Sequence, residues 1–156
     1  SSAASDVYKR QEVASLADRI ASDLIPKGRA DIIISLEPME ALRYLPYLST
    51  EGWIITGTTP FVNIDNYPDQ EALQKDLSAR PHVIAIDVEA IAKQAASPRS
   101  ANIVLLGAAA PFLDIEAGKL EAGVRAVFAR KGEEIVNMNL AAFRAGYEYA
   151  QKSLKR

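Results

Sequence analysis

Three short apolar runs that alternate with helical patterns constrain the fold of this chain more than any other feature. The runs occupy residues 32–36, 53–56 and 82–86 and are rich in β-branched residues, as strands are. Between them, apolar residues recur three or four apart, which is the spacing of one helix face. This alternation predicts an α/β fold with a mainly parallel sheet. The run over 32–36 is apolar on both faces, which predicts a central strand.

Helix-start residues and prolines set the expected boundaries around the first two strands. Pro38 suits the first turn of a helix that continues to residue 48, with a kink at Pro46. After the second strand, Asp69 precedes a helix expected over residues 70–79.

Four helices are expected in the rest of the chain, the first of them capped by Asp87. They cover residues 88–95, 101–113, 116–131 and 139–153. The helix over 101–113 is almost wholly apolar, so we expect it to be buried. Its surplus of apolar surface, for so few strands, favours a subunit of a larger complex over a lone protein.

The composition excludes several function classes. A chain of 156 residues has the length of one domain, and its net charge of −2 disfavours binding to nucleic acid or to an anionic membrane. Without cysteine, the chain cannot supply a disulfide, a thiolate nucleophile or the sulfur ligands of an iron–sulfur cluster. No segment approaches the roughly 20 apolar residues that span a bilayer. We expect a soluble, cytoplasmic protein that holds no metal, and His82 is read as structural or exposed.

Residues 1–11 do not fit the pattern of the remaining chain. They are polar and small, with neither a helical nor a strand period. Residues 6–11, DVYKRQ, are also the in-frame translation of GATGTGTATAAGAGACAG, the end of a widely used sequencing transposon. We therefore expect residues 1–11 to be a non-native tail and residues 12–156 to be the domain; the alternative is a natural N-terminal tail. The genomic DNA upstream of Glu12 would decide between them.

Polar residues after the first two strands are the strongest candidates for a binding site. Glu37 follows the first strand, at the sheet edge where open α/β sheets carry functional groups, although a carboxylate that stabilises the next helix N-terminus is the favoured reading. Thr56, Thr58 and Thr59 follow the second strand, where hydroxyls and backbone N–H groups could hold an anion. A turn that satisfies its own backbone is the favoured alternative there.

Asn102 is a further weak candidate, since an amide on a buried helix needs hydrogen-bond partners in a loop or a partner chain. The sequence contains no glycine-rich phosphate loop of the G-x-G-x-x-G or Walker type, and we recognise no catalytic group. The cofactor-binding residues are therefore unknown, and none is assigned to catalysis or to a metal.

Several stretches in a fixed order resemble the γ-type domain of 2-oxoacid:ferredoxin oxidoreductases. They are ADIIISLEP at 30–38, SANIVLLGA at 100–108 and NLAAFRAG at 139–146. SDLIPKG at 22–28 and MEALRYLPYL at 39–48 are similar to the β subunits of the indolepyruvate enzymes within that family. The resemblance implies a three-layer sandwich, a mainly parallel sheet flanked by helices. It also implies that a first strand, a G-x-G-G-x-G loop and a helix are missing here.

The resemblance implies the function of a non-catalytic subunit. The indolepyruvate enzymes of that family oxidatively decarboxylate aryl pyruvates to acyl-CoA and pass the electrons to ferredoxin. Thiamine diphosphate and the iron–sulfur clusters are expected in the large α subunit, the partner of this chain, with CoA as co-substrate. This chain alone is expected to be inactive. Two alternatives stay open: a γ subunit specific for pyruvate or 2-oxoglutarate, and a free-standing module that binds a small anion or nucleotide.

Overall fold

A parallel sheet lies at the centre of the computed structural model, which describes residues 24–61 and 67–156. Its strands are β1 (Ala30–Ser35), β2 (Leu48–Gly57) and β3 (Val83–Ile86). They are hydrogen-bonded in the order β1-β2-β3, and both pairs are parallel. The α/β prediction is confirmed. The tail expected at residues 1–11 lies outside the described residues, so it stays a prediction.

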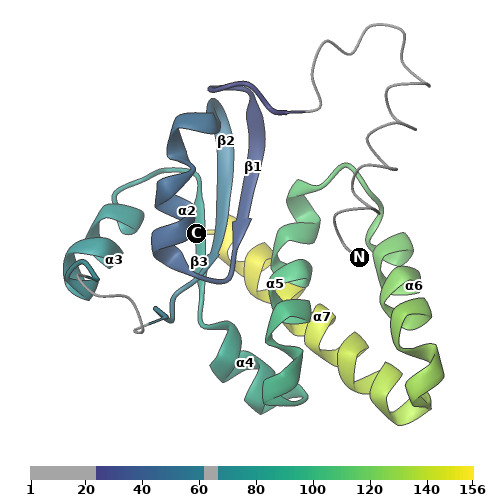
Figure 1. Cartoon of the computed structure of the whole chain (residues 1–156). Coiled ribbons are helices and arrows are strands. Elements are labelled where there is room, and N and C mark those ends of the chain that lie inside the picture. Colours follow the sequence, from purple (N-terminus) through teal and green to yellow (C-terminus); the bar gives the residue numbers. More distant parts are fainter. Residues whose placement is uncertain (1–23, 62–66) are drawn as a thin grey trace, which may run out of the picture.

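Helices cover both faces of the sheet, which gives the three layers expected from the resemblance (Figure 1). The helices are α2 (Pro38–Arg43), α3 (Gln70–Ser78), α4 (Val88–Ala95), α5 (Ala101–Ala109), α6 (Ala117–Phe128) and α7 (Glu133–Leu154). Helices α2 and α3 lie on one side of the sheet. On the other side, α5 contacts all three strands, while α4 and α7 pack against α5, and α6 packs on the outer side of α7.

Local capping explains where three of these helices begin. Glu37 caps α2 and Pro38 occupies its first turn, as the position of the proline predicts. The Asp69 carboxylate accepts a hydrogen bond from the Glu71 N–H, and the Asp87 carboxylate accepts one from the Ala90 N–H. Each cap satisfies a backbone donor that the helix leaves unpaired.

The helix expected to kink at Pro46 instead ends before it. Helix α2 stops at Arg43, and a 3-10 turn over Leu45–Tyr47 leads directly into β2. Proline lacks the N–H that a continued α-helix would need, so the chain leaves the helix here. Strand β2 therefore begins at Leu48, five residues before the run that predicted it, and an irregularity in its pairing with β1 accommodates the extra length.

The prediction of a central strand over 32–36 is wrong for the described part of the chain. There β1 pairs with β2 alone and forms an edge, and β2 is central. Ile34 is consequently 43% exposed and Leu36 is 37% exposed. A groove of about 590 Å³ runs along this edge and includes Tyr44 and Tyr47. The apolar pattern reports which residues prefer burial, not which neighbour buries them.

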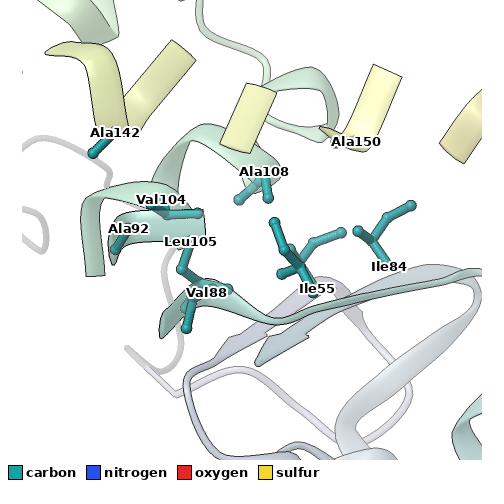
Figure 2. Close-up of a cluster of buried hydrophobic side chains, with 11 residues drawn as sticks. Ile55, Ile84, Val88, Ala92, Val104, Leu105, Ala108, Ala142 and Ala150 are labelled. Carbon is teal, nitrogen blue, oxygen red and sulfur yellow. The ribbon is translucent and has the colours of Figure 1, made fainter. Parts of the chain in front are cut away.

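The main core lies between the sheet and helices α4, α5 and α7, and Figure 2 shows its side chains pointing toward one another. The labelled residues are Ile55, Ile84, Val88, Ala92, Val104, Leu105, Ala108, Ala142 and Ala150. Helix α5 is buried between the sheet and α7, as its apolar sequence predicts. The apolar surplus expected on it is therefore covered within this chain. The exposed apolar groups lie instead along the β1 edge and on single positions such as Val127.

Helices α5 and α7 cross so closely that glycine is required on each. A β-carbon on Gly107 would lie 2.0 Å from the Phe143 carbonyl oxygen, and one on Gly146 would lie 1.9 Å from the Val104 carbonyl oxygen. Each glycine lies in one of the stretches that carry the family resemblance. Each of the two stretches therefore supplies one of the glycines that the crossing of α5 and α7 requires.

The last helix is longer than the apolar pattern predicts. Helix α7 begins at Glu133 rather than at residue 139, directly after Gly132, whose φ of +98° suits glycine. Glu133 and Glu134 in its first turn complement the helix dipole, a start signal that the apolar spacing does not carry. Helix α5 is shorter than expected and ends at Ala109, where a 3-10 turn over Ala110–Phe112 follows.

Candidate functional site

The carboxyl ends of the parallel strands meet at one sheet edge, as the candidate site requires. Ser35 of β1 lies opposite Thr56 of β2, so the residues that follow each strand are neighbours. The chains approach so closely that a β-carbon on Gly57 would lie 2.2 Å from the Leu36 carbonyl oxygen. Glu37 and the threonine turn are thus brought to the same edge.

Glu37 is buried, at 4% exposure, and both of its carboxylate oxygens are engaged. Oε2 accepts a hydrogen bond from the Glu40 N–H at 2.8 Å, which caps α2. Oε1 accepts one from the hydroxyl of Tyr67. The Ser35 hydroxyl also bonds the Glu37 backbone, because it donates to the carbonyl at 2.7 Å and accepts from the N–H at 3.2 Å. The geometry is that of a helix cap and a tertiary anchor.

Tyr67 is the residue of this edge that the sequence did not reveal. Partial burial, together with the hydrogen bond and the negative charge of Glu37, raises the pKa of its hydroxyl well above the usual value. The hydroxyl therefore stays protonated and holds the start of the segment before α3 against the end of β1. The two residues are 30 positions apart, so no local spacing could have indicated the pair.

The three threonines have different environments. Thr56 is fully buried, and its hydroxyl donates to the Gly57 carbonyl at 2.9 Å. The Thr58 N–H donates to the Ile86 carbonyl and extends the β2–β3 pairing. Thr59 lines a cavity of about 600 Å³, with Asp87, Glu89 and Lys93 among its other walls. Two acidic side chains beside one lysine do not favour an anion there.

Asn102 does not join this edge and is not buried. It is exposed in the first turn of α5, where its amide oxygen accepts a hydrogen bond from the Ile103 N–H at 3.0 Å. The expectation of a buried amide is wrong, because the apolar faces of α5 contact the sheet and α7 while Asn102 lies on the side that neither covers; a tie to a partner chain stays a prediction.

His82 is half-buried and stacks on Trp53, with ring centroids 4.9 Å apart. Within residues 24–61 and 67–156, no group of three His, Cys, Asp or Glu side chains is placed to hold a metal ion. In the same residues, no helix has the length and apolar character needed to cross a bilayer. The edge that unites Glu37 and the threonine turn is thus largely bonded to itself, and its described residues present no nucleophile beside a base.

Comparison with known proteins identifies the family. The family model described as pyruvate ferredoxin/flavodoxin oxidoreductase matches residues 7–149. The chain is 34% identical to the indolepyruvate oxidoreductase subunit IorB of Methanothermobacter thermautotrophicus, over 83% of this chain and 69% of that protein. It is 29% identical to IorB of Pyrococcus horikoshii, over 88% of this chain and 71% of that protein.

A solved structure supports the fold. It is a 2-oxoglutarate:ferredoxin oxidoreductase from Magnetococcus marinus with 2-oxoglutarate, coenzyme A and succinyl-CoA bound, with a TM-score of 0.57 and 24% identity. The match covers 85% of this chain but 22% of that one, so our chain corresponds to about a fifth of the larger protein. Together with the family match over most of its length, this places the chain in the pyruvate ferredoxin/flavodoxin oxidoreductase family.

Proposed function

We propose that this chain is the β subunit of an indolepyruvate:ferredoxin oxidoreductase. In that role it supports the CoA-dependent oxidative decarboxylation of aryl pyruvates, with ferredoxin as the electron acceptor. The observation that carries the proposal is the match to IorB subunits from several archaea across more than four-fifths of the chain. The apolar groove along β1 also supports a subunit role, because exposed apolar surface of this kind marks contact sites.

The proposal assigns the redox and thiamine cofactors to the large α subunit. Iron–sulfur clusters are held by cysteine thiolates, and this chain has no cysteine. Its carboxyl edge is occupied by its own hydrogen bonds rather than by groups free to act on a substrate. The contribution of this chain is therefore structural support for a partner that carries the chemistry.

The test is a reconstituted enzyme. The gene product that contains this chain is expressed with the large subunit from the same genome, and ferredoxin reduction is measured with indolepyruvate and CoA. We expect reduction that requires both subunits and CoA. A stable complex of the two gene products that does not oxidise any 2-oxoacid would refute the proposal.

Substrate comparison in the same assay separates the nearest alternative. A γ subunit of a pyruvate or 2-oxoglutarate enzyme would give higher kcat/KM with those acids than with indolepyruvate. A free-standing anion or nucleotide module is less favoured, because Glu37 and Thr56 are engaged internally. For that module, CoA or a nucleotide at 100 times its Kd should stabilise the isolated chain by about 2.7 kcal/mol.

A further inference from the structure

A cavity among the helices has the chemistry of a ligand site that the proposed function does not use. Its volume is about 380 Å³, which lies within the roughly 300–1,000 Å³ typical of small-molecule sites. Its walls come from the turn before α5, the end of α6 and the first half of α7. None of the residues at the carboxyl edge of the sheet lines it.

Two nearly buried polar side chains line this cavity with hydrogen-bonding capacity unused. Ser100 is 2% exposed and sits at the N-cap of α5, yet its hydroxyl makes no capping bond and has no partner among the described residues. Asn139 is 5% exposed, and its amide N–H donates to the Ile135 carbonyl at 2.9 Å, which leaves the amide oxygen free of described partners. Buried polar groups usually have partners, so these two are available to hydrogen-bond a molecule that enters the cavity.

Both groups retain some contact with solvent. Across the described ranges, Arg80 Nε is the one side-chain nitrogen or oxygen that is both sealed from solvent and without a partner. The Ser100 hydroxyl and the Asn139 oxygen are therefore not sealed. Both residues line the cavity, so a ligand bound there would lie beside them.

Two cations stand at the same cavity without a counter-charge. Arg99 and Lys131 are exposed and line it, and neither forms an ion pair with any residue that the structure describes. By contrast, Arg125 and Arg144 on α6 and α7 pair with Glu133 and Glu121. The two free cations favour an anionic ligand.

The backbone groups and apolar side chains around the cavity indicate which kind of anion fits it. Phosphate sites are commonly built from free backbone N–H groups, but the turn here uses its own: the Arg99 N–H donates to the Ser97 hydroxyl and the Ser100 N–H to the Ser97 carbonyl. Arg99, Lys131 and the Ser100 hydroxyl can hold a carboxylate without such N–H groups. Phe128 and Met138 add an apolar wall.

We propose that this cavity binds a small carboxylate that carries an apolar body. Its carboxylate lies between Arg99 and Lys131 and accepts a hydrogen bond from the Ser100 hydroxyl, while the apolar body packs against Phe128 and Met138. The residues that line the site all come from this chain, and the proposal does not depend on which 2-oxoacid the enzyme uses.

The test uses the gene product that contains this chain, with phenylacetate as the probe and phenylacetamide as its uncharged counterpart. Backbone amide chemical shifts of residues 97–101 and 131–139 report binding at the site. We expect chemical-shift changes that saturate at millimolar concentrations of phenylacetate. Phenylacetamide should cause much weaker changes, since Arg99 and Lys131 attract the carboxylate and not the uncharged amide. Absence of saturable shifts with phenylacetate, or equal shifts with both compounds, overturns the proposal.

Variants locate the site. Lys131→Gln and Ser100→Ala should each raise the Kd for phenylacetate about five- to tenfold, because each removes a hydrogen bond to a charged group. Arg130→Gln is the matched control: it removes the same charge from the neighbouring residue, which is exposed and does not line the cavity. Equal weakening by Arg130→Gln and Lys131→Gln would mean that binding reflects general surface charge, and would also overturn the proposal.

Discussion

Alanine in place of Gly146 should destabilise the protein by forcing α5 and α7 apart. The added β-carbon would lie 1.9 Å from the Val104 carbonyl oxygen, about 1.5 Å closer than the 3.4 Å at which ordinary van der Waals contact begins. Both sides of the contact are backbone, so no side chain can rotate away. The helices must separate, and the core between them loses contacts.

Two opposing effects set the magnitude. Alanine is about 1 kcal/mol more favourable than glycine in a helix interior. Overpacking a core costs about 1–3 kcal/mol, and a backbone clash belongs at the upper end of that range. The net loss should be about 2 kcal/mol in the free energy of unfolding. For a chain of this length, that lowers Tm by about 4–8 °C.

Gly123→Ala provides the matched control. Gly123 lies in the middle of α6, and a β-carbon there would meet no atom within 4 Å. The same substitution should therefore raise stability by about 1 kcal/mol, since only the propensity term remains. Thermal unfolding followed by circular dichroism measures both variants. A rise in Tm for Gly146→Ala as large as for Gly123→Ala would refute the close crossing.

The double variant sharpens the test. Gly107→Ala should cost about as much as Gly146→Ala, because its β-carbon would lie 2.0 Å from the Phe143 carbonyl oxygen. One separation of the helices relieves both clashes. The two substitutions together should therefore destabilise by less than the sum of the single effects. Strict additivity would show that the two glycines do not share one crossing.

Two further predictions concern single hydrogen bonds. Tyr67→Phe should lower the free energy of unfolding by about 1–3 kcal/mol at neutral pH, because the buried Glu37 carboxylate loses a partner, and urea unfolding measures it. The folded state raises the pKa of Tyr67, so the stability that the Tyr67 hydroxyl contributes is complete below the ordinary tyrosine pKa and declines as the pH rises further. The difference in unfolding free energy between wild type and Tyr67→Phe should therefore narrow above about pH 10. A difference that stays constant to pH 11 would contradict this. Asp87→Ala should cost about 1 kcal/mol through loss of the α4 cap, whereas Asp87→Asn should cost little, and a similar loss for both would contradict a capping role.

Helix caps and single-helix boundaries were readable from the sequence where a local signal encodes them. Helix α4 spans the predicted residues 88–95, and Asp87 caps it as expected. Helix α3 differs from its prediction by one residue. In both cases the cap and the apolar spacing lie within a few positions of each other, so neighbouring residues carry the whole signal.

The candidate site was only partly predictable. The sequence indicated that Glu37 and the threonine turn follow adjacent strands, and the register of β1 with β2 brings them together. It could not indicate that the Tyr67 hydroxyl occupies one oxygen of Glu37, because no short-range pattern links the two residues. Nor could it show that Ser100 and Asn139 line one cavity, since different helices contribute them.

The sequence by itself determined the alternation of strands and helices, the family and most of the caps, because these depend on interactions between residues close along the chain. Only the tertiary structure decided that β1 is an edge of the described sheet, that Asn102 is exposed, and that Gly107 and Gly146 meet across two helices. An apolar residue favours burial, and a small residue permits close approach of two segments. Which neighbour satisfies that preference depends on segments far away in sequence, and those are brought together only by the fold.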